Sequence, residues 1–517
     1  MNASGNKTVQ KWMPGLIISM GIVTLVLLLY YFDMLEKVEG TAFDLRFKIK
    51  GGKDVPYLVE LITIDDESLR VFGKWPWRRS LHARLIQILS EYRAKSIMFD
   101  ILFVEHDTIH PEDDALLIKT ARKAGNVYCP SFFPIGGIET DPEEQVFRTE
   151  EMVLPFDGLL EALKGTGYAN GTPDEDGVIR KALLFTKYGG NFFPLLSFKM
   201  ACDFLDVRLK DMKLKPGRYI EFASEEGGKR LKIPVTSYYN MLIHYPSDIK
   251  SYSFKDVIQS YENIKHGKSP SVPLEDFKDK VVFVGITATG SVDLQPIPLY
   301  SSYPMVGAHA AIFDTITSSQ FIRHTTVLQD ILIILFLGGV MGLVIPRLRP
   351  LKGVLFTLLL LILYLSGNYL LFKIFGISAI IVYPLGLIFL CDLSLTIYRY
   401  ATEEKEKRWI RNIFSTYITP SVVNEILKNP DALALGGMRR EMTVFFSDLA
   451  DFTSISERLA PEELVRLING YLDAMTRVIF KHQGTLDKYE GDAIMAFWNA
   501  PIDQPAPALR CCKAALE

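Results

Sequence analysis

The chain has 517 residues, enough for about three or four domains. Its 57 Lys and Arg residues against 60 Asp and Glu residues give a formal charge of −3, which argues against a nucleic-acid-binding protein. Hydrophobic residues make up 49% of the chain, a share that favours membrane-spanning segments over a wholly soluble protein.

The first apolar segment, Pro14 to Phe32, carries no charge and is long enough to cross a bilayer. Lys7 and Lys11 precede it, as in a signal peptide, but no small-residue cleavage site follows, and Asp33 opens an acidic stretch. We therefore expect a retained membrane anchor, preceded by a cytoplasmic N-terminus at residues 1–13.

In the next region, residues 33–326, apolar runs alternate with amphipathic segments. Leu58 to Ile64, Lys95 to Phe103 and Lys280 to Gly285 are typical of buried strands, and the apolar spacing of Ser80 to Tyr92 predicts a helix. Strands interleaved with helices predict an α/β layer fold.

Several side chains in this region are candidates for a binding site. Asp65, Asp66 and Asp100 follow predicted strands, and open α/β sheets bind ligands at such strand ends. Structural roles in turns are nevertheless favoured for all three carboxylates. Trp75 and Trp77 are expected to pack in the core or a loop rather than to form a binding platform.

The five cysteines show no metal-ligand spacing. If residues 33–326 face an oxidising compartment, Cys129 and Cys202 could form a disulfide, but spacing alone does not establish this pair. The adjacent Cys511 and Cys512 lie on a helical pattern and are expected to pack rather than to bind a metal.

Short motifs in this region resemble the CHASE2 family of extracellular sensors. They are Ile64-Asp-Asp-Glu-Ser-Leu, Gly73-Lys-Trp-Pro-Trp-Arg-Arg-Ser-Leu, Phe99-Asp-Ile-Leu-Phe, Asp174-Glu-Asp-Gly-Val-Ile-Arg, Val281-Val-Phe-Val-Gly-Ile-Thr-Ala-Thr-Gly and Gly307-Ala-His-Ala. The resemblance covers about Met34 to Arg323 and implies a sensor that precedes three membrane helices and a cytoplasmic output domain. It provides no agreed ligand, so the stimulus and the sign of regulation stay open.

Three further apolar segments, Val327 to Ile345, Gly353 to Phe372 and Ile374 to Tyr398, are long enough to span a membrane. The link from Pro346 to Lys352 carries three positive charges and is therefore expected to be cytoplasmic. Four crossings of the plasma (inner) membrane then place the sensor outside the cytoplasm and the C-terminal region inside it. Residues 399–436 open with a charged run and are expected to form a cytoplasmic signalling helix and linker.

The last region, residues 437–517, predicts a strand, a helix and a strand hairpin. Met442 to Phe446 is a short apolar run typical of a strand buried on both faces. A helix is expected from about Pro461 to a stop at Gly484. Thr485 to Trp498 then predicts two strands folded about Glu490-Gly491.

This arrangement would bring Asp448, at the end of the first strand, beside Asp492, at the tip of the hairpin. Two adjacent carboxylates repel each other unless a cation lies between them, and Mg²⁺ prefers oxygen ligands. Because Mg²⁺ is typically held by one or two carboxylates plus substrate phosphates, the pair suggests a nucleotide site. From spacing alone, ordinary turn and cap roles for both residues are equally compatible.

Two motifs here resemble the catalytic domain of the class III nucleotidyl cyclases. They are Phe445-Phe-Ser-Asp-Leu-Ala-Asp-Phe-Thr-Ser-Ile-Ser-Glu and Lys488-Tyr-Glu-Gly-Asp-Ala-Ile-Met-Ala-Phe, in the family's order and spacing. The resemblance covers about Ala401 to Glu517 and implies an α+β, ferredoxin-like domain of which this chain carries only part. It implies that the ribose 3′ hydroxyl of ATP attacks the α-phosphorus, which gives 3′,5′-cyclic AMP and pyrophosphate.

The resemblance also assigns roles to individual residues. Asp448 and Asp492 would bind two metal ions, Mg²⁺ or Mn²⁺, together with the backbone carbonyl of Leu449. The purine-selecting position is Lys488, where adenylate cyclases have Lys and guanylate cyclases have Glu, so the resemblance favours ATP. The loop that wraps the triphosphate with its backbone N–H groups would consist of Leu449, Ala450, Asp451, Phe452 and Thr453.

In the family, each site forms between two catalytic domains, so a homodimer is expected, with Lys488 and Asp492 of one chain serving opposite sites. Asp451 stands where many members have Gly, and we expect its side chain to point outward. The family's second purine contact and its transition-state Asn and Arg lie beyond Glu517, so this chain alone is expected to show little turnover. A guanylate cyclase and a silent domain that only binds nucleotide or dimerises are the alternatives.

Overall fold

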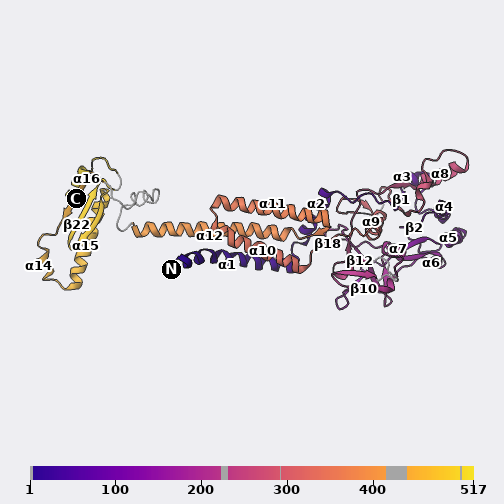
Figure 1. The fold of residues 1–517 in the computed structure, drawn as a ribbon, viewed down its shortest axis with the longest axis horizontal. Helices are drawn as coiled ribbons and strands as arrows, with labels where there is room; N and C mark the ends of the chain where they lie inside the picture. The colour runs from indigo at the N-terminus through magenta and orange to yellow at the C-terminus, as the bar shows by residue number, and fades with distance from the viewer. Residues whose placement is uncertain (1–3, 135, 223–230, 291–292, 415–438, 501–502) are drawn as a thin grey trace. The chain divides into compact units, whose positions relative to one another are not determined.

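The computed structural model describes residues 4–134, 136–222, 231–290, 293–414, 439–500 and 503–517 (Figure 1). The chain divides into two compact units, Met1–Asp392 and Leu393–Glu517.

The sensor is organised around a six-stranded sheet in the order β14-β1-β15-β2-β3-β6, and every neighbouring pair is parallel. Its central strands are buried apolar runs, as expected for parallel strands covered on both faces. The expected α/β fold is therefore confirmed. The strands are β1 (Val59–Ile64), β2 (Ser96–Phe99), β3 (Val127–Ser131), β6 (Gly165–Tyr168), β14 (Ser251–Ser253) and β15 (Val281–Ile286).

Helices cover both faces of this sheet. Successive residues of β1, Leu61 and Ile62, enter different hydrophobic clusters, because side chains alternate along a strand. One cluster contains residues of α2 (Glu36–Lys50), α7 (Leu196–Phe204) and α9 (Met305–Thr317). The other contains residues of α3 (Asp66–Phe72), α4 (Arg79–Glu91), α5 (Pro111–Ala124), α6 (Leu159–Ala162) and α8 (Phe254–Lys265).

Smaller sheets flank this core. One contains β4 (Glu139–Asp141), β5 (Val146–Thr149), β8 (Phe185–Tyr188) and β9 (Asn191–Pro194). A second contains β10 (Met212–Lys215), β11 (Tyr219–Phe222) and β12 (Leu231–Pro234). Two-stranded pairs join β7 (Lys181–Leu183) to β13 (Asn240–Leu242), and β16 (Leu294–Gln295) to β17 (Tyr303–Pro304).

Cys129 and Cys202 do not form the disulfide that was considered from the sequence; both are free and buried. Cys129 lies in β3 and belongs to one hydrophobic cluster, whereas Cys202 lies in α7 and belongs to the other. The two thiols are therefore held in separate layers of the sensor. Burial in apolar surroundings raises the pKa of both thiols, so both stay protonated at neutral pH.

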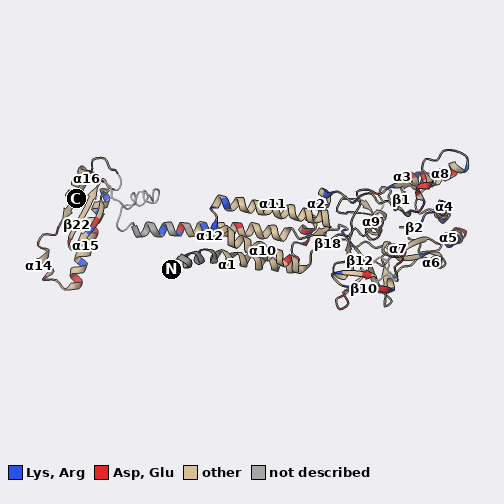
Figure 2. Ribbon diagram, viewed as in Figure 1, with Lys and Arg blue, Asp and Glu red and all other residues tan. Residues whose placement is uncertain are grey.

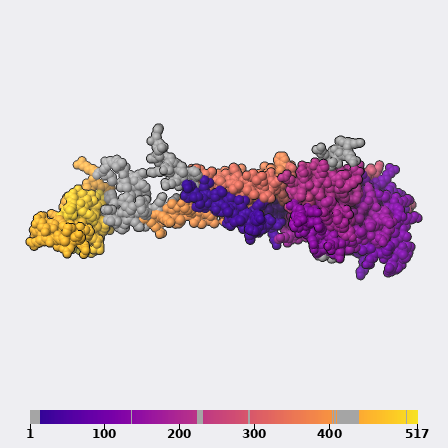
Figure 3. Space-filling model, turned by 90° about the horizontal axis from the view of Figure 1, so that it is seen from below, coloured from indigo at the N-terminus to yellow at the C-terminus, as the bar shows by residue number. Residues whose placement is uncertain are grey.

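Within the described residues, four helices are long and apolar enough to cross a membrane. They are α1 (Ser4–Tyr31), α10 (Val327–Val344), α11 (Pro350–Phe375) and α12 (Val382–Phe414). Figure 2 shows that Lys, Arg, Asp and Glu are sparse along these helices except in the C-terminal part of α12, and Figure 3 shows α1 lying along their surface. At Gly338, an added Cβ would lie 2.2 Å from Val23 Cγ2, so glycine is required where α10 packs on α1.

The last membrane helix begins later than the sequence suggested. We expected membrane segments at residues 353–372 and 374–398, but α11 extends to Phe375 and α12 begins only at Val382. Gly376, with a φ of 63°, ends α11 in the left-handed conformation that favours glycine. The turn then forms β19 (Ile377–Ser378), which pairs with β18 (Arg323–His324) of the sensor.

The C-terminal unit contains a three-stranded antiparallel sheet in the order β20-β22-β21. Its described elements are β20 (Thr443–Ser447), α14 (Phe452–Ser456), α15 (Pro461–Lys481), β21 (Thr485–Glu490), β22 (Ala493–Trp498) and α16 (Pro507–Leu516). This strand–helix–hairpin order confirms the expected α+β arrangement. The greater part of the expected linker, residues 415–436, lies outside the described residues.

One expectation for this unit is wrong, because β20 is not buried on both faces. Phe445 packs against the fully buried Trp498, but Val444 is 44% exposed and Phe446 is 67% exposed. Side chains alternate along a strand, and α15 and α16 pack against only one face of the sheet. The apolar run therefore marked a strand without showing which faces are covered.

Candidate functional site

The end of β20 and the start of β22 bring Asp448 and Asp492 together. Ser447 pairs with Ile494 in the antiparallel ladder, so the two aspartates follow and precede adjacent strand residues. The Leu449 N–H lies 3.1 Å from Asp448 Oδ1 and 3.4 Å from Asp492 Oδ2. The two carboxylates are therefore separated by no more than the combined length of two hydrogen bonds.

The donor set at this point suits a hard divalent cation. Among the described residues, neither Asp448 nor Asp492 forms an ion pair with Lys or Arg, so the two negative charges are not compensated by the protein. The described part of the chain contains no cluster of three or more His, Cys, Asp or Glu side chains that could hold a metal. A cation here would therefore need backbone, water or phosphate oxygens as further ligands, as is usual for Mg²⁺.

The Leu449 carbonyl, the third expected metal ligand, already accepts a hydrogen bond from the Phe452 N–H at 3.3 Å. A carbonyl oxygen has a second lone pair, so this bond leaves one acceptor position. The hydrogen bond also closes the turn that leads from β20 into α14, and so fixes the course of the loop that follows Asp448.

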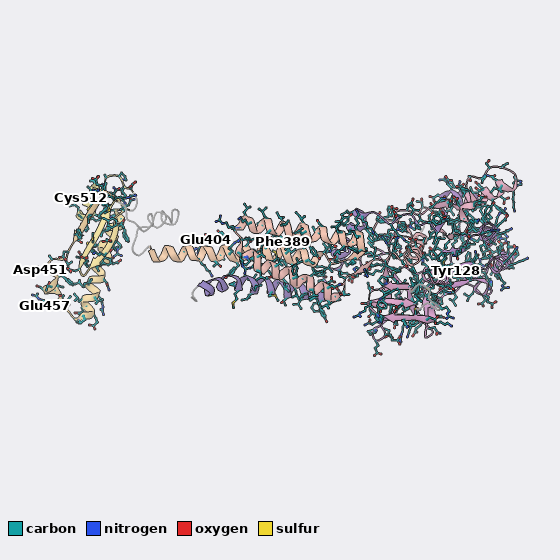
Figure 4. The ribbon with its side chains drawn as sticks, in the orientation of Figure 1. Tyr128, Phe389, Glu404, Asp451, Glu457 and Cys512 are labelled. Carbon is teal, nitrogen blue, oxygen red and sulfur yellow. The ribbon has the colours of Figure 1, made fainter. Side chains whose placement is uncertain are left out.

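Asp451 occupies the left-handed region, with a φ of 61° and a ψ of 22°, immediately before α14. Glycine adopts this conformation readily and aspartate tolerates it, which explains how Asp can stand where the resemblance indicates Gly. The Asp451 side chain is exposed, in agreement with the outward orientation that we expected. Figure 4 labels Asp451 at one end of this unit and Cys512, on α16, at the other.

Lys488 lies on β21, which is separated from β20 by β22. Its Nζ atom lies 2.6 Å from Glu490 Oε1, and this partner raises the lysine pKa, so the side chain is charged at neutral pH. Lys488 is thus separated from Asp448 by a strand, whereas Asp492 lies in the turn that joins β21 to β22.

The candidate aspartates of the sensor fall into two groups. Asp65 caps α3 by accepting hydrogen bonds from the Ser68 N–H at 2.8 Å and from Ser253 Oγ at 3.0 Å. Asp66 accepts hydrogen bonds from the Thr289 N–H at 3.0 Å and from Thr289 Oγ1 at 2.6 Å. The favoured cap role is therefore correct for Asp65, whereas Asp66 has a structural role of another kind, since it holds the distant Thr289.

Asp100 behaves differently from Asp65 and Asp66. Its Oδ2 atom is buried and has no hydrogen-bond partner in the described structure. Burial raises its pKa to about 7. Burial, together with the nearby Asp100 charge, also raises the pKa of Asp293 to about 7. No local pattern predicts this pair, because Asp293 lies in a loop far along the chain from Asp100.

This pair makes the stability of the sensor depend on pH. The folded sensor keeps the Asp100 proton up to about pH 7, whereas the unfolded chain releases it near its ordinary pKa. Stability should therefore fall as pH rises from about 4 to about 7.

The melting temperature of wild type, measured by thermal unfolding, should be lower at pH 8 than at pH 5. We expect this decrease to be smaller in Asp100→Asn. Asp211→Asn, at a more exposed carboxylate, should leave that decrease unchanged; equal decreases in all three proteins would contradict this prediction.

Trp75 and Trp77 pack inside the sensor, as expected. Trp77 is 7% exposed, contacts the rings of Phe72 and Phe254, and donates a hydrogen bond from Nε1 to the Gly73 carbonyl at 2.8 Å. A buried indole whose N–H is satisfied has a structural role.

Two family models match this chain. The CHASE2 domain matches residues 21–344, which is more than half of the chain. The chain belongs to the CHASE2 family. The adenylate and guanylate cyclase catalytic domain matches residues 438–517 of this CHASE2 protein, which includes Asp448, Asp492 and Lys488. Cyclase domains of this class depend on divalent metal ions, in agreement with the chemistry of the aspartate pair.

Curated relatives match only the C-terminal part. Adenylate cyclase 1 of Rhizobium meliloti (strain 1021) is 34% identical over 103 residues, which are 20% of this chain and 16% of the relative. Adenylate cyclase of Anabaena cylindrica is 35% identical over 98 residues, which are 19% of this chain and 18% of the relative. The CHASE2 protein thus spans less than a fifth of the length of either relative.

Solved cyclase structures match the same part. The adenylyl cyclase CyaB from P. aeruginosa is 40% identical and covers 14% of this chain and 39% of its own, with a TM-score of 0.14. The guanylyl cyclase Cya2 is 44% identical and covers 16% of this chain and 42% of its own, with a TM-score of 0.16.

Proposed function

We propose that this CHASE2 protein is a membrane-bound receptor adenylate cyclase that converts ATP to 3′,5′-cyclic AMP and pyrophosphate under the control of its sensor. The observation that carries the proposal is the meeting of Asp448 and Asp492 at the Leu449 N–H. A catalytically silent domain would have no need to keep two unpaired carboxylates at this position. The experiment that tests the proposal is a measurement of the cyclic nucleotide formed by the natural protein.

The chain's residues have distinct roles in this proposal. Asp448, Asp492 and the Leu449 carbonyl would hold two divalent cations, Mg²⁺ or Mn²⁺. When bound, such ions activate a hydroxyl nucleophile and neutralise a triphosphate. The loop from Ala450 to Thr453 leads into α14. The Phe452 N–H already donates to the Leu449 carbonyl, but the next N–H groups of the first turn lack intrahelical partners and can donate to phosphate oxygens. This loop would orient the triphosphate of ATP.

A complete site would require a homodimer in this proposal. Lys488 lies on the outer strand β21 and Asp448 follows the other outer strand, β20, with β22 between the two strands. One chain would provide the metal-binding aspartates of a site, and its partner would provide the lysine that contacts the purine.

Lys488→Glu in the natural protein should lower the preference for ATP over GTP. A hydrogen bond to a charged group contributes about 1.5–3 kcal/mol, so the ratio of kcat/KM values should fall about tenfold or more. Cyclic nucleotide formation from each substrate measures this ratio. Lys513→Glu, an identical charge change on exposed α16, is the control and should leave the ratio unchanged. An unaltered ratio in Lys488→Glu would refute the role of Lys488.

For the membrane topology, we propose that the N-terminus, the link between α10 and α11 and the C-terminal unit lie in the cytoplasm. The link carries Arg347, Arg349 and Lys352, and positive charges favour the cytoplasmic side. The sensor would then lie outside the cytoplasm at the plasma (inner) membrane, and the cyclase domain would face the ATP pool. The stimulus of the sensor is not specified by this topology.

A further inference from the structure

A cavity of about 130 Å³ lies where the sensor joins the membrane helices. Its walls come from α2, from the segment Asp174–Lys181 and from the turn between α11 and α12, and they include Phe43, Leu242 and Ile380. The cavity is separate from the aspartate pair of the cyclase domain, and the roles proposed above do not involve it.

The position of the cavity corresponds to the boundary of the membrane. α2 begins at Glu36, shortly after α1 ends at Tyr31, and the turn from Ser378 to Ile380 lies between the two membrane helices α11 and α12. In Figure 1, α2, α11 and β18 meet at the junction between the helices and the sensor. A molecule in the cavity would therefore lie at the level of lipid headgroups.

Two residues of the cavity wall hold the start of α12, and we call Glu39 and Arg46 the α2 clamp. The Glu39 carboxylate accepts hydrogen bonds from the N–H groups of Ile381, at 2.8 and 3.0 Å, and Val382, at 2.8 Å. Arg46 Nη1 donates to Asn368 Oδ1 and to the Ala379 carbonyl, both at 2.8 Å. An anion at a helix N-terminus is favourable, so the clamp fixes where α12 begins.

Burial of the two charged side chains of the clamp costs electrostatic free energy. Burial raises the pKa of Glu39 and lowers the pKa of Arg46, and the two side chains are 3.9 Å apart. Arg46 Nε is buried and has no hydrogen-bond partner in the described structure. One N–H donor of the clamp, at Arg46 Nε, is thus without an acceptor in the described structure.

The mouth of the cavity presents both signs of charge in loose pairs. Glu36 lies 3.9 Å from Lys181 and Lys37 lies 3.6 Å from Glu175, and both distances exceed that of a good hydrogen bond. Lys181 is also held by Asp174 at 3.1 Å, whereas Lys37 and Glu175 are mostly exposed. Exposed pairs of this kind contribute little to stability, so they can exchange for the charges of a ligand at small cost.

We propose that this cavity binds a small zwitterion, with an ammonium group and an anionic group, of the size of a phosphoethanolamine headgroup. Carboxylates at the mouth would receive the ammonium group, and the exposed Lys37 would receive the anionic group. The volume is comparable to that of an engineered cavity of about 150 Å³ that holds benzene, so a compact headgroup fits. The position at the membrane boundary favours a lipid over a solute as the source.

Occupancy of the cavity would act on α12 through the α2 clamp. A ligand beside Glu39 and Arg46 changes the free energy of burying these two charges. It therefore also changes how strongly Glu39 binds the N–H groups of Ile381 and Val382. The same helix continues without a break from Val382 to Phe414. The consequence for catalytic output rests on the function proposed above, whereas the binding itself does not.

Binding can be tested on the natural protein by native mass spectrometry, after purification from bilayers of phosphatidylethanolamine and phosphatidylglycerol. We expect wild type to retain phosphatidylethanolamine selectively. The double variant Glu36→Gln, Lys37→Gln should lose about fivefold or more of this retention, since each exposed ion pair contributes up to about 1 kcal/mol. Lys48→Gln, on α2 but outside the cavity, is the matched control and should behave as wild type.

A second arm distinguishes the source of the zwitterion. O-phosphoethanolamine in solution should raise the melting temperature of wild type more than ethanolamine or phosphate alone, and this effect should be absent in the double variant. Selective lipid retention supports a membrane source, and stabilisation by the soluble compound supports a solute source. Failure of both arms would overturn the proposal. Neither readout requires cyclic nucleotide formation, so a failure of the proposed function would be recognised separately.

Discussion

Asp448→Ala in the natural full-length protein should abolish cyclic AMP formation, with a loss of about 10²-fold or more. The variant removes one of the two carboxylates that converge on the Leu449 N–H, and the remaining Asp492 cannot replace its oxygen ligands. Asp492→Ala should cause a loss of the same order for the same reason. Initial rates of cyclic AMP formation from ATP, measured with Mg²⁺ and with Mn²⁺, provide the test.

Asp473→Ala is a suitable control for these variants. Asp473 lies on α15 and its side chain is exposed. It forms an ion pair with Arg477, which is similarly exposed and lies 3.0 Å away. Its removal should change the rate of cyclic AMP formation little. A rate within a few-fold of wild type for Asp448→Ala, in a protein that still folds, would be incompatible with a metal-binding role for the aspartate pair.

Arg180→Met should strongly destabilise the sensor. The buried guanidinium lies 2.7 Å from both Asp44 and Asp176 and 3.0 Å from Asp174, and so ties α2 to the loop beside it. Its removal leaves Asp44 and Asp176 without this cation and leaves Asp174 with Lys181 alone, at 3.1 Å. The loss of one partner from a buried ion pair costs about 3–5 kcal/mol. Thermal unfolding in detergent, followed by circular dichroism, should show a clear decrease in melting temperature.

The origin of this loss can be checked by a second substitution. Asp44→Asn in the Arg180→Met background removes one of the repelling charges and should recover part of the melting temperature. Arg122→Met is the control, because Arg122 lies on the surface and its distance from Glu161 is 4.0 Å. If Arg180→Met and Arg122→Met had the same small effect, the ion-pair cluster would have no role in stability.

The main features of the fold could be predicted because their sequence signals are local. The strand β15 appears as a continuous apolar run, and β1 as an apolar run interrupted by Glu60 and Thr63, which is close to the pattern of parallel strands buried on both faces. The convergence of Asp448 and Asp492 follows from strand, helix and hairpin patterns that lie next to one another in the sequence. The same reasoning was wrong for β20, since an apolar run does not reveal that one face lacks a covering helix.

Features that depend on long-range contacts could not be predicted. The α2 clamp joins Glu39 to Ile381, and the buried acid pair joins Asp100 to Asp293, across hundreds of residues. No periodicity marks such partners. The late start of α12 has the same origin, because the turn before it is shaped by pairing between β18 and β19 as well as by Gly376.

The most direct test of the central claim is to supply the natural protein with ATP and GTP separately, with Mg²⁺ or Mn²⁺, and to identify the cyclic nucleotide that forms. The proposed function predicts cyclic AMP and pyrophosphate from ATP, much less cyclic GMP from GTP, and no product after chelation of the metal. If a folded, full-length protein formed neither cyclic AMP nor cyclic GMP, the result would contradict it.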